Sequence, residues 1–223
     1  MVNRTDYTTQ RSGRDPDLMR VVVFISGRGS NLQALLKHQN NYRICHVISN
    51  RRDAAGLAFA ESHHVPTSVI PWKNNRQAES KALQLLTGIQ PDLIVLAGFM
   101  RLLSADFVTH FPYKIINIHP SLLPLYPGLN THQRAIDDHQ TQHGATVHFV
   151  DQYLDRGQRI SQCRLNILPE DTAETLADRL LSKEHTLLTT TVDKLATGEI
   201  YVDNNQLYHN HQPLTQPLVW PNT

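Results

Sequence analysis

The chain has 223 residues, which fits one α/β domain with a substantial buried core and argues against a multidomain assembly. Its 21 basic and 20 acidic residues leave a net charge of +1, so no general positive field is available for a nucleic-acid backbone. The longest apolar run, residues 93–100, is too short to cross a bilayer. With only two cysteines, neither a disulfide framework nor a cysteine metal site is expected. We therefore predict a cytoplasmic protein that binds neither nucleic acid nor membrane.

The first half of the chain reads as alternating strands and helices. Residues 1–19 carry charges but no apolar stretch, and we expect them to form a solvated leader. Residues 21–25 are β-branched and aromatic, and leucines at helical spacing follow directly. Further strands are expected at residues 43–49, 67–72, 93–98 and 115–118, and further helices at residues 54–62 and 76–87.

After residue 145 the pattern changes to two extended segments, residues 145–151 and 160–166, which predict antiparallel edge strands. Asp171 and Thr172 can cap a long amphipathic helix. The whole predicts an α/β protein with a Rossmann-like, mostly parallel sheet, covered by helices on both faces and extended by antiparallel strands. We expect one catalytic domain over residues 20–200, followed by a C-terminal hairpin and tail at residues 201–223.

The segment Ser26-Gly-Arg-Gly-Ser-Asn31 lies between the first strand and the first helix. Glycines permit a tight turn there, and free N–H groups at the start of a helix can receive a phosphate. The dinucleotide fingerprint is incomplete, because Leu32 stands where a third glycine would be. Arg51 and Arg52 after the second strand suit a 2′-phosphate, so an NADP-dependent oxidoreductase remains an alternative.

Asn117 and His119 lie two apart on a predicted strand, so their side chains project from the same face at its carboxyl end. Open α/β sheets bind their ligands at that end, although a capped strand with a hydrogen-bonded core histidine explains the pair equally well. The proline-rich stretch of residues 120–128 favours a site, because a stiff loop keeps it organised before binding. Asp155 can meet His119 across the sheet end, where a carboxylate favours the imidazolium form.

The thirteen histidines are many for this length, and three pairs have spacings that metal ligands use. These are His63-His64, His139-x-x-x-His143 and His209-x-His211. No cysteine or paired carboxylate completes a coordination shell at any of them. We interpret them as surface or loop histidines, and we expect no metal cofactor.

Four separated blocks resemble the glycinamide ribonucleotide (GAR) transformylases, a family of folate-dependent formyltransferases. The blocks are residues 26–31, 96–103, 117–124 and 143–148, and the Asn-x-His-Pro-Ser-Leu-Leu-Pro segment at residues 117–124 is the most specific of them. The resemblance covers roughly residues 20–200. It implies transfer of a formyl group from the co-substrate 10-formyltetrahydrofolate to the amine of GAR in purine synthesis, by a monomer or a homodimer that binds these two small molecules.

The resemblance also implies residue roles. Catalysis is assigned to Asn117, His119 and Asp155. The ribonucleotide would bind Gly29, Ser30 and Asn31 through its phosphate and Glu184 through its ribose. The folate would bind Arg76, Met100, Arg101, Leu102, Leu103 and Asn117, with Arg76 at its carboxylate tail. From the residues alone, Arg76 is nearly as well explained as a solvated residue at a helix start.

The chain departs from the family pattern after the catalytic aspartate. The family continues with one residue, Gly-Pro and an aliphatic pair, whereas Asp155 is followed here by Arg156, Gly157, Gln158 and Arg159. An arginine turned inward would compete for Asp155, and we expect both to point to solvent, because long basic side chains rarely bury without a partner. A formyltetrahydrofolate hydrolase and a binding protein silenced by this change are further alternatives.

Overall fold

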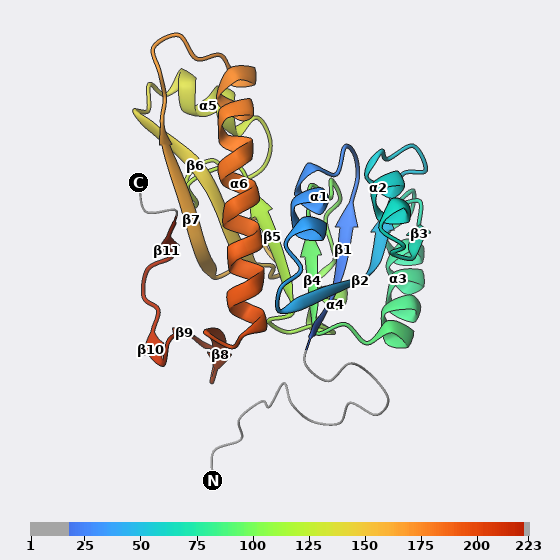
Figure 1. The fold of residues 1–223 in the computed structure, drawn as a ribbon. Helices are drawn as coiled ribbons and strands as arrows, with labels where there is room; N and C mark the ends of the chain where they lie inside the picture. Colours follow the sequence, from blue (N-terminus) through green and yellow to red (C-terminus); the bar gives the residue numbers. More distant parts are fainter. Residues whose placement is uncertain (1–17, 221–223) are drawn as a thin grey trace.

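A computed structural model describes residues 18–220, and its centre is an eight-stranded sheet in the order β11-β7-β6-β5-β4-β1-β2-β3 (Figure 1). Most of the predicted leader, residues 1–17, lies outside the described residues, as do residues 221–223 of the predicted tail. Met19 already belongs to the first strand. Within the described range, no helix combines the length and the apolar character that crossing a membrane requires.

Five strands form the parallel half of the sheet, as the sequence predicts. They are β1 (Met19–Ile25), β2 (Tyr42–Ser49), β3 (Thr67–Val69), β4 (Leu93–Leu96) and β5 (Ile115–His119). Residues 21–25 of β1 are fully buried, and their side chains alternate between two cores: Val21, Val23 and Ile25 join one, whereas Val22 and Phe24 join the other. Burial on both faces explains its continuous apolar sequence.

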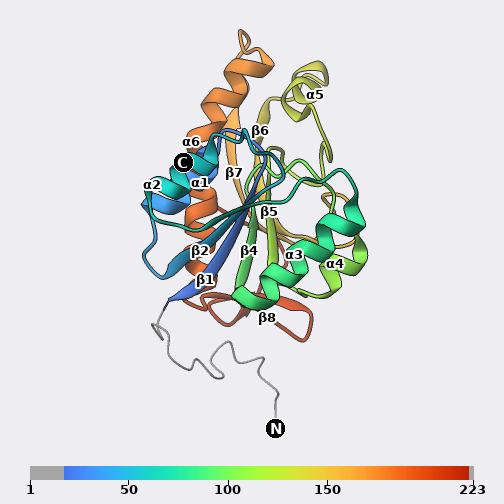
Figure 2. The same cartoon turned by 90° about the vertical axis from the view of Figure 1, so that its right-hand side faces the viewer.

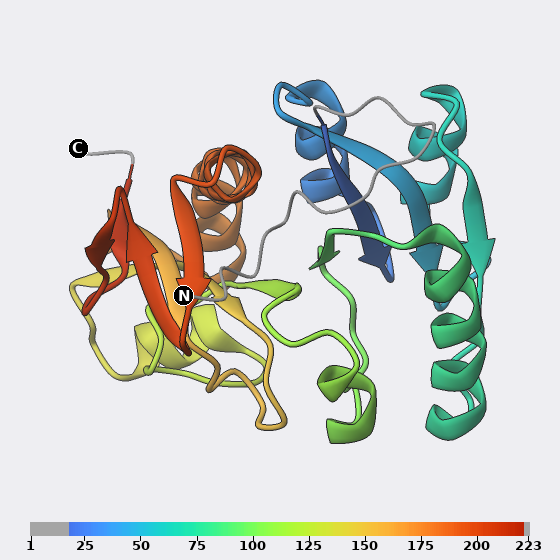
Figure 3. The ribbon, with the colours of Figure 1, turned by 90° about the horizontal axis from the view of Figure 1, so that it is seen from below.

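Helices cover both faces of this sheet (Figures 2 and 3). On one face lie α1 (Ser30–Lys37), α2 (Gly56–Ser62) and α6 (Ala173–Ala196); on the other lie α3 (Asn75–Ile89) and α4 (Ala105–Thr109). Thr172 caps α6 through a capping box, which confirms the predicted start of the long helix. The short helices α4 and α5 (Thr131–Asp137) were not predicted.

The predicted antiparallel strands after residue 145 are confirmed. Strand β6 (Gln142–Phe149) runs antiparallel to both β5 and β7 (Arg159–Asn166). The register places His148 opposite Asn117 and Thr146 opposite His119. This pairing brings side chains of β6 to the end of β5 where the predicted site lies.

The C-terminal segment forms the predicted hairpin and then returns to the main sheet. Strands β8 (Ile200–Asp203) and β9 (Gln206–His209) pair around Asn204 and Asn205, both of which have positive φ. A third short strand, β10 (Gln212–Pro213), extends this small sheet, and β11 (Leu218–Val219) pairs with β7. The segment after residue 200 is therefore joined to the main sheet by hydrogen bonds.

Candidate active site

The turn between β1 and α1 leaves backbone N–H groups free at the start of a helix. Gly29 precedes α1 with φ 76°, and no side chain caps the helix. A Cβ at Gly29 would lie 2.6 Å from Cα of Gly56, so both the left-handed backbone and the close approach of α2 require glycine here. The uncapped helix start offers N–H donors and the positive end of the helix dipole to an anion.

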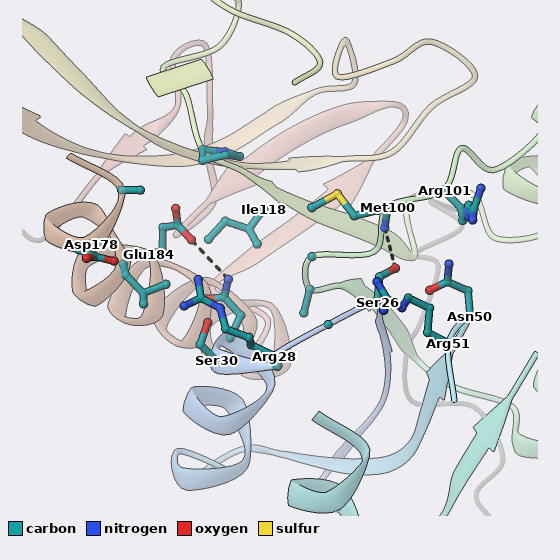
Figure 4. A pocket seen from close by; sticks show the side chains of 18 of the residues that line it. Ser26, Arg28, Ser30, Asn50, Arg51, Met100, Arg101, Ile118, Asp178 and Glu184 are labelled. Carbon is teal, nitrogen blue, oxygen red and sulfur yellow. Dashed lines mark hydrogen bonds between the residues drawn. The ribbon is translucent and has the colours of Figure 1, made fainter. Parts of the chain in front are cut away.

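This turn borders a cavity of about 550 Å³ between α1, α6 and the ends of β1, β4 and β5 (Figure 4). Ser30, Asp178 and Glu184 lie toward one side of the view, and Asn50, Arg51 and Arg101 lie toward the other. Of the predicted site residues, the cavity brings together Gly29, Ser30, Asn31, Glu184, Met100 and Arg101.

Glu184 projects from α6 toward the start of α1. Its Oε2 accepts a hydrogen bond of 3.4 Å from Nδ2 of Asn31, and burial raises the pKa of Glu184 to about 7. Asn31 is 9% exposed, and its Oδ1 has no hydrogen-bond partner among the described residues. A buried acceptor without a partner is costly, so this side of the cavity suits a ligand that supplies a donor.

Asn117, His119, His148 and Asp155 form a second group, here called the polar cluster. Nδ1 of His119 lies 3.5 Å from Oδ2 of Asp155, and the imidazole and carboxylate are each 7% exposed. On the other side of the ring, Nε2 of His119 donates to the Tyr126 carbonyl at 2.8 Å. Asp155 also accepts a 2.9 Å hydrogen bond from the Gly128 N–H, which ties its turn to the proline-rich loop. The structure thus brings together the three residues that the sequence proposes for catalysis.

His148 completes the polar cluster, and sequence reasoning assigned it no role. Its Nδ1 donates to the Phe149 carbonyl at 2.8 Å, so Nε2 can accept the 3.2 Å hydrogen bond from Nδ2 of Asn117. Burial lowers the pKa of His148, which favours this neutral form. Only the register of β5 with β6 reveals the contact, because the two residues are far apart in sequence.

The loop after His119 is held by hydrogen bonds within the loop and from strand β7. The Ser121 hydroxyl donates to the Leu125 carbonyl at 2.6 Å, and the Gln162 amide of β7 donates to the Leu123 carbonyl at 2.9 Å. The Leu123–Pro124 peptide bond is cis. These contacts fix the loop beside the polar cluster.

The expectation that both arginines after Asp155 point to solvent is wrong for one of them. Arg156 is exposed. Arg159, at the start of β7, is half-buried and donates to the Leu123 carbonyl at 2.8 Å, because the loop offers its guanidinium a backbone acceptor. The guanidinium that turns inward therefore supports the loop and forms no ion pair with Asp155.

The predicted folate residues lie beside the cavity rather than all within it. Met100 and Leu102 are 66% and 61% exposed, which is unusual for large apolar side chains and typical of a surface that a ligand covers. Arg76 is exposed on the first turn of α3 and does not line the cavity. Glu79, one turn further on, accepts hydrogen bonds from the Ser104 N–H and hydroxyl, which anchors the start of α3 near residues 100–103.

Two other sequence interpretations can be compared with the structure. Arg51, considered for a 2′-phosphate, is engaged with Asp53 through two hydrogen bonds. His143, interpreted as a surface or loop residue, is in fact buried in β6 at 1% exposure, because both faces of this strand are covered from His143 onward. Within residues 18–220, no three His, Cys, Asp or Glu side chains are arranged to hold a metal ion, and Cys45 and Cys163 are free thiols.

The fold is Rossmann-like, and it combines a helix start that offers donors to an anion with a histidine–aspartate pair at the sheet end. Residues 19–192 match the formyl transferase family. The chain is 38% identical to the phosphoribosylglycinamide formyltransferase of Haemophilus influenzae over 198 residues, which are 86% of this chain and 93% of the relative.

Solved structures give the same result. The phosphoribosylglycinamide formyltransferase of Coxiella burnetii superposes with a TM-score of 0.87 at 42% identity, covering 92% of this chain and all of the other. A formyltetrahydrofolate deformylase from Pseudomonas syringae is more distant, with a TM-score of 0.80 at 26% identity over 86% of this chain and 66% of the other. The chain therefore belongs to the formyl transferase family and, within it, to the phosphoribosylglycinamide formyltransferases.

Proposed function

We propose that this chain transfers the formyl group of 10-formyltetrahydrofolate to the amine of GAR. Besides membership of the family, one observation carries the proposal. A single cavity joins the uncapped start of α1 to Ile118 and Pro120, which neighbour His119 of the polar cluster. A ribonucleotide phosphate at one end and a reacting amine at the other require that arrangement. The enzyme is expected to act in the cytoplasm as a monomer or a homodimer.

The proposed binding mode follows the chemistry of each part of the cavity. The phosphate accepts hydrogen bonds from the backbone N–H groups of Gly29, Ser30 and Asn31, and the ribose donates a hydrogen bond to Glu184. The pterin of the folate covers the exposed apolar surface of Met100 and Leu102, with Arg101 and Leu103 on either side of Leu102. Arg76 on α3 pairs with the carboxylate tail of the folate.

The nucleophile in this mechanism is the substrate amine, so the protein needs to stabilise charge and move a proton. As the amine attacks, negative charge develops on the formyl oxygen of a tetrahedral intermediate. Asn117 stabilises that charge with an N–H group, and His119 stabilises it as an imidazolium. The attacking nitrogen then loses a proton and N10 of the folate gains one, through His119 or a water that it orders. The intermediate collapses as the bond between the formyl carbon and N10 breaks, which releases tetrahydrofolate and leaves the formyl group on the amine. No step is assigned to a metal ion.

The geometry supports these roles. Both ring nitrogens of His119 face oxygen acceptors, Tyr126 at Nε2 and Asp155 at Nδ1, and a doubly protonated ring can donate to both. The 3.5 Å contact with Asp155 is longer than a normal hydrogen bond, as expected of a catalytic contact that tightens when substrate binds. His148 accepts from one N–H of Asn117 and so fixes the orientation of the carboxamide, leaving the other N–H for the formyl oxygen.

The experiment is a formyl-transfer assay with GAR and 10-formyltetrahydrofolate, comparing the wild type with His119→Ala. The proposal requires formylated GAR from the wild type and a loss of at least ~100-fold in the variant. Formate released at the same rate without GAR would instead indicate a hydrolase. Folate binding without either product would indicate a silenced binding protein, and both results would overturn the proposal.

A further inference from the structure

A pair of histidines connects the cavity to the first residues of β6. His132 on α5 is half-buried and lines the cavity, whereas His143 behind it is 1% exposed. Nδ1 of His132 lies 3.0 Å from Nε2 of His143, and the rings meet edge to face with their centroids 4.9 Å apart. The proposed mechanism uses neither residue.

The hydrogen-bond partners of His143 determine which nitrogen carries the proton. The ring of His143 is hydrogen-bonded to the backbone of Pro120, which has only a carbonyl to offer, so a ring N–H must donate to it. Because Nε2 faces His132, the donor is Nδ1. Burial also lowers the pKa of His143 to about 4, so the ring is neutral and its Nε2 is an acceptor.

The tautomer of His132 follows from that of His143. Nδ1 of His132 must donate to the lone pair of Nε2 on His143. Burial and the neighbouring His119 both lower the pKa of His132, so this ring is neutral as well. Its Nε2 therefore presents a lone pair, and no described residue forms a hydrogen bond with that atom.

The lone pair is directed to a ligand hydroxyl rather than to a phosphate. A neutral acceptor repels phosphate oxygens and attracts an O–H group. His132 shares the cavity with the Glu184 carboxylate, and α5, which carries His132, packs against α6, which carries Glu184. Two acceptors on neighbouring helices match the two hydroxyl donors of a ribose.

We propose that His132 is a specificity-determining residue that accepts a hydrogen bond from a ribose hydroxyl through Nε2, with His143 fixing its tautomer. This inference rests on the proposed function, because it takes GAR as the ligand. In this arrangement Glu184 accepts a hydrogen bond from one ribose hydroxyl, and His132 accepts one from the other.

Two variants separate the cavity-facing nitrogen from the buried one. In His132→Asn the amide stands in for Nδ1 and keeps a donor for His143, while the cavity-facing acceptor is lost. In His132→Gln the longer side chain returns an oxygen near the position of Nε2. We expect His132→Asn to raise the Kd of GAR, measured calorimetrically without folate, and the KM of GAR about tenfold with kcat within about twofold. His132→Gln should remain within about threefold of the wild type.

A substrate lacking one ribose hydroxyl tests the same contact without depending on the fold of a variant. The wild type should bind either 2′-deoxy or 3′-deoxy GAR about tenfold more weakly than GAR, and His132→Asn should show no further loss with the analogue that lacks the hydroxyl bound by His132. The inference would be overturned if His132→Asn and His132→Gln lost GAR affinity equally. It would also be overturned if His132→Asn still discriminated against both analogues as the wild type does. A wild type that binds GAR yet transfers no formyl group would refute the proposed function alone.

Discussion

The polar cluster and the cavity differ in how their polar atoms are satisfied. In the polar cluster, Asn117, His119, His148 and Asp155 all have partners from the protein. In the cavity, Oδ1 of Asn31 and Oδ1 of Asn50 are buried and have no hydrogen-bond partner among residues 18–220. Satisfied groups keep one geometry before substrate arrives, whereas unpaired acceptors leave part of their stabilisation to the ligand. Under the proposed function, we therefore expect changes in the polar cluster to affect the rate of the reaction and changes in the cavity to affect the affinity for GAR.

Removing an oxyanion donor is expected to have the largest effect. Asn117→Ala and His119→Ala should each lower kcat at least ~100-fold, since loss of one such donor costs ~3 to 4 kcal/mol of transition-state stabilisation. GAR affinity, measured by calorimetry without folate, should change less than about threefold, because neither residue lines the cavity. Near-normal turnover of either folded variant would contradict the assignment, and a large loss of GAR affinity would erase the distinction between the two regions.

Neutralising Asp155 is expected to have the next largest effect on kcat. In Asp155→Asn the amide oxygen can still accept from the Gly128 N–H, so the turn stays attached to the loop while the charge facing His119 is lost. We expect kcat to fall about 100-fold, as for loss of a general acid–base partner, and the pH profile of kcat to change shape.

Asp151→Asn is the matched control for Asp155→Asn. Asp151 accepts from the Tyr153 N–H in the same turn but forms no contact with His119. Its kcat should stay within about twofold of the wild type. If both variants lost activity equally, the effect would belong to the turn as a whole and not to the histidine–aspartate pair.

The sequence is informative wherever one local pattern decides the structure. Apolar runs predicted the parallel strands, and Asp171 and Thr172 predicted the start of α6. Helices α4 and α5 have only five and seven residues, too few for a helical period to stand out. His143 and His148 are buried on β6, but their partners are distant in sequence and depend on register and on the placement of α5. Arg159 was misjudged because its acceptor is a backbone carbonyl of a loop, which sequence patterns do not reveal.

Changing Glu184 should affect binding more than turnover. With its pKa raised to about 7, Glu184 loses its charge as the pH falls from 8 to 6, and a protonated carboxyl accepts hydrogen bonds less well. GAR affinity of the wild type should therefore decrease over this range. Glu184→Gln should bind GAR about tenfold more weakly at pH 8 and should lose this part of the pH dependence.

Glu174→Gln, on the exposed first turn of the same helix, provides the control for Glu184→Gln. It should reproduce the affinity and the pH dependence of the wild type. Titration of the substrate itself contributes equally to all three proteins, so only the difference between them reports on Glu184. A Glu184→Gln enzyme with the full pH dependence would place the responsible group elsewhere.

The two arginines after Asp155 should show the smallest effects on turnover. Arg156 is exposed, so its charge is screened by solvent, and Arg156→Gln should leave kcat within about twofold. Arg159→Gln should instead lower the free energy of unfolding by about 1 to 2 kcal/mol in urea titrations, because the Leu123 carbonyl loses a charged donor while keeping the one from Gln162. A rise or fall of tenfold in kcat for Arg156→Gln would show that its charge does reach Asp155 during the reaction. The turn would then have to move inward when substrate binds, and the polar cluster would be less fully organised beforehand than its hydrogen bonds indicate.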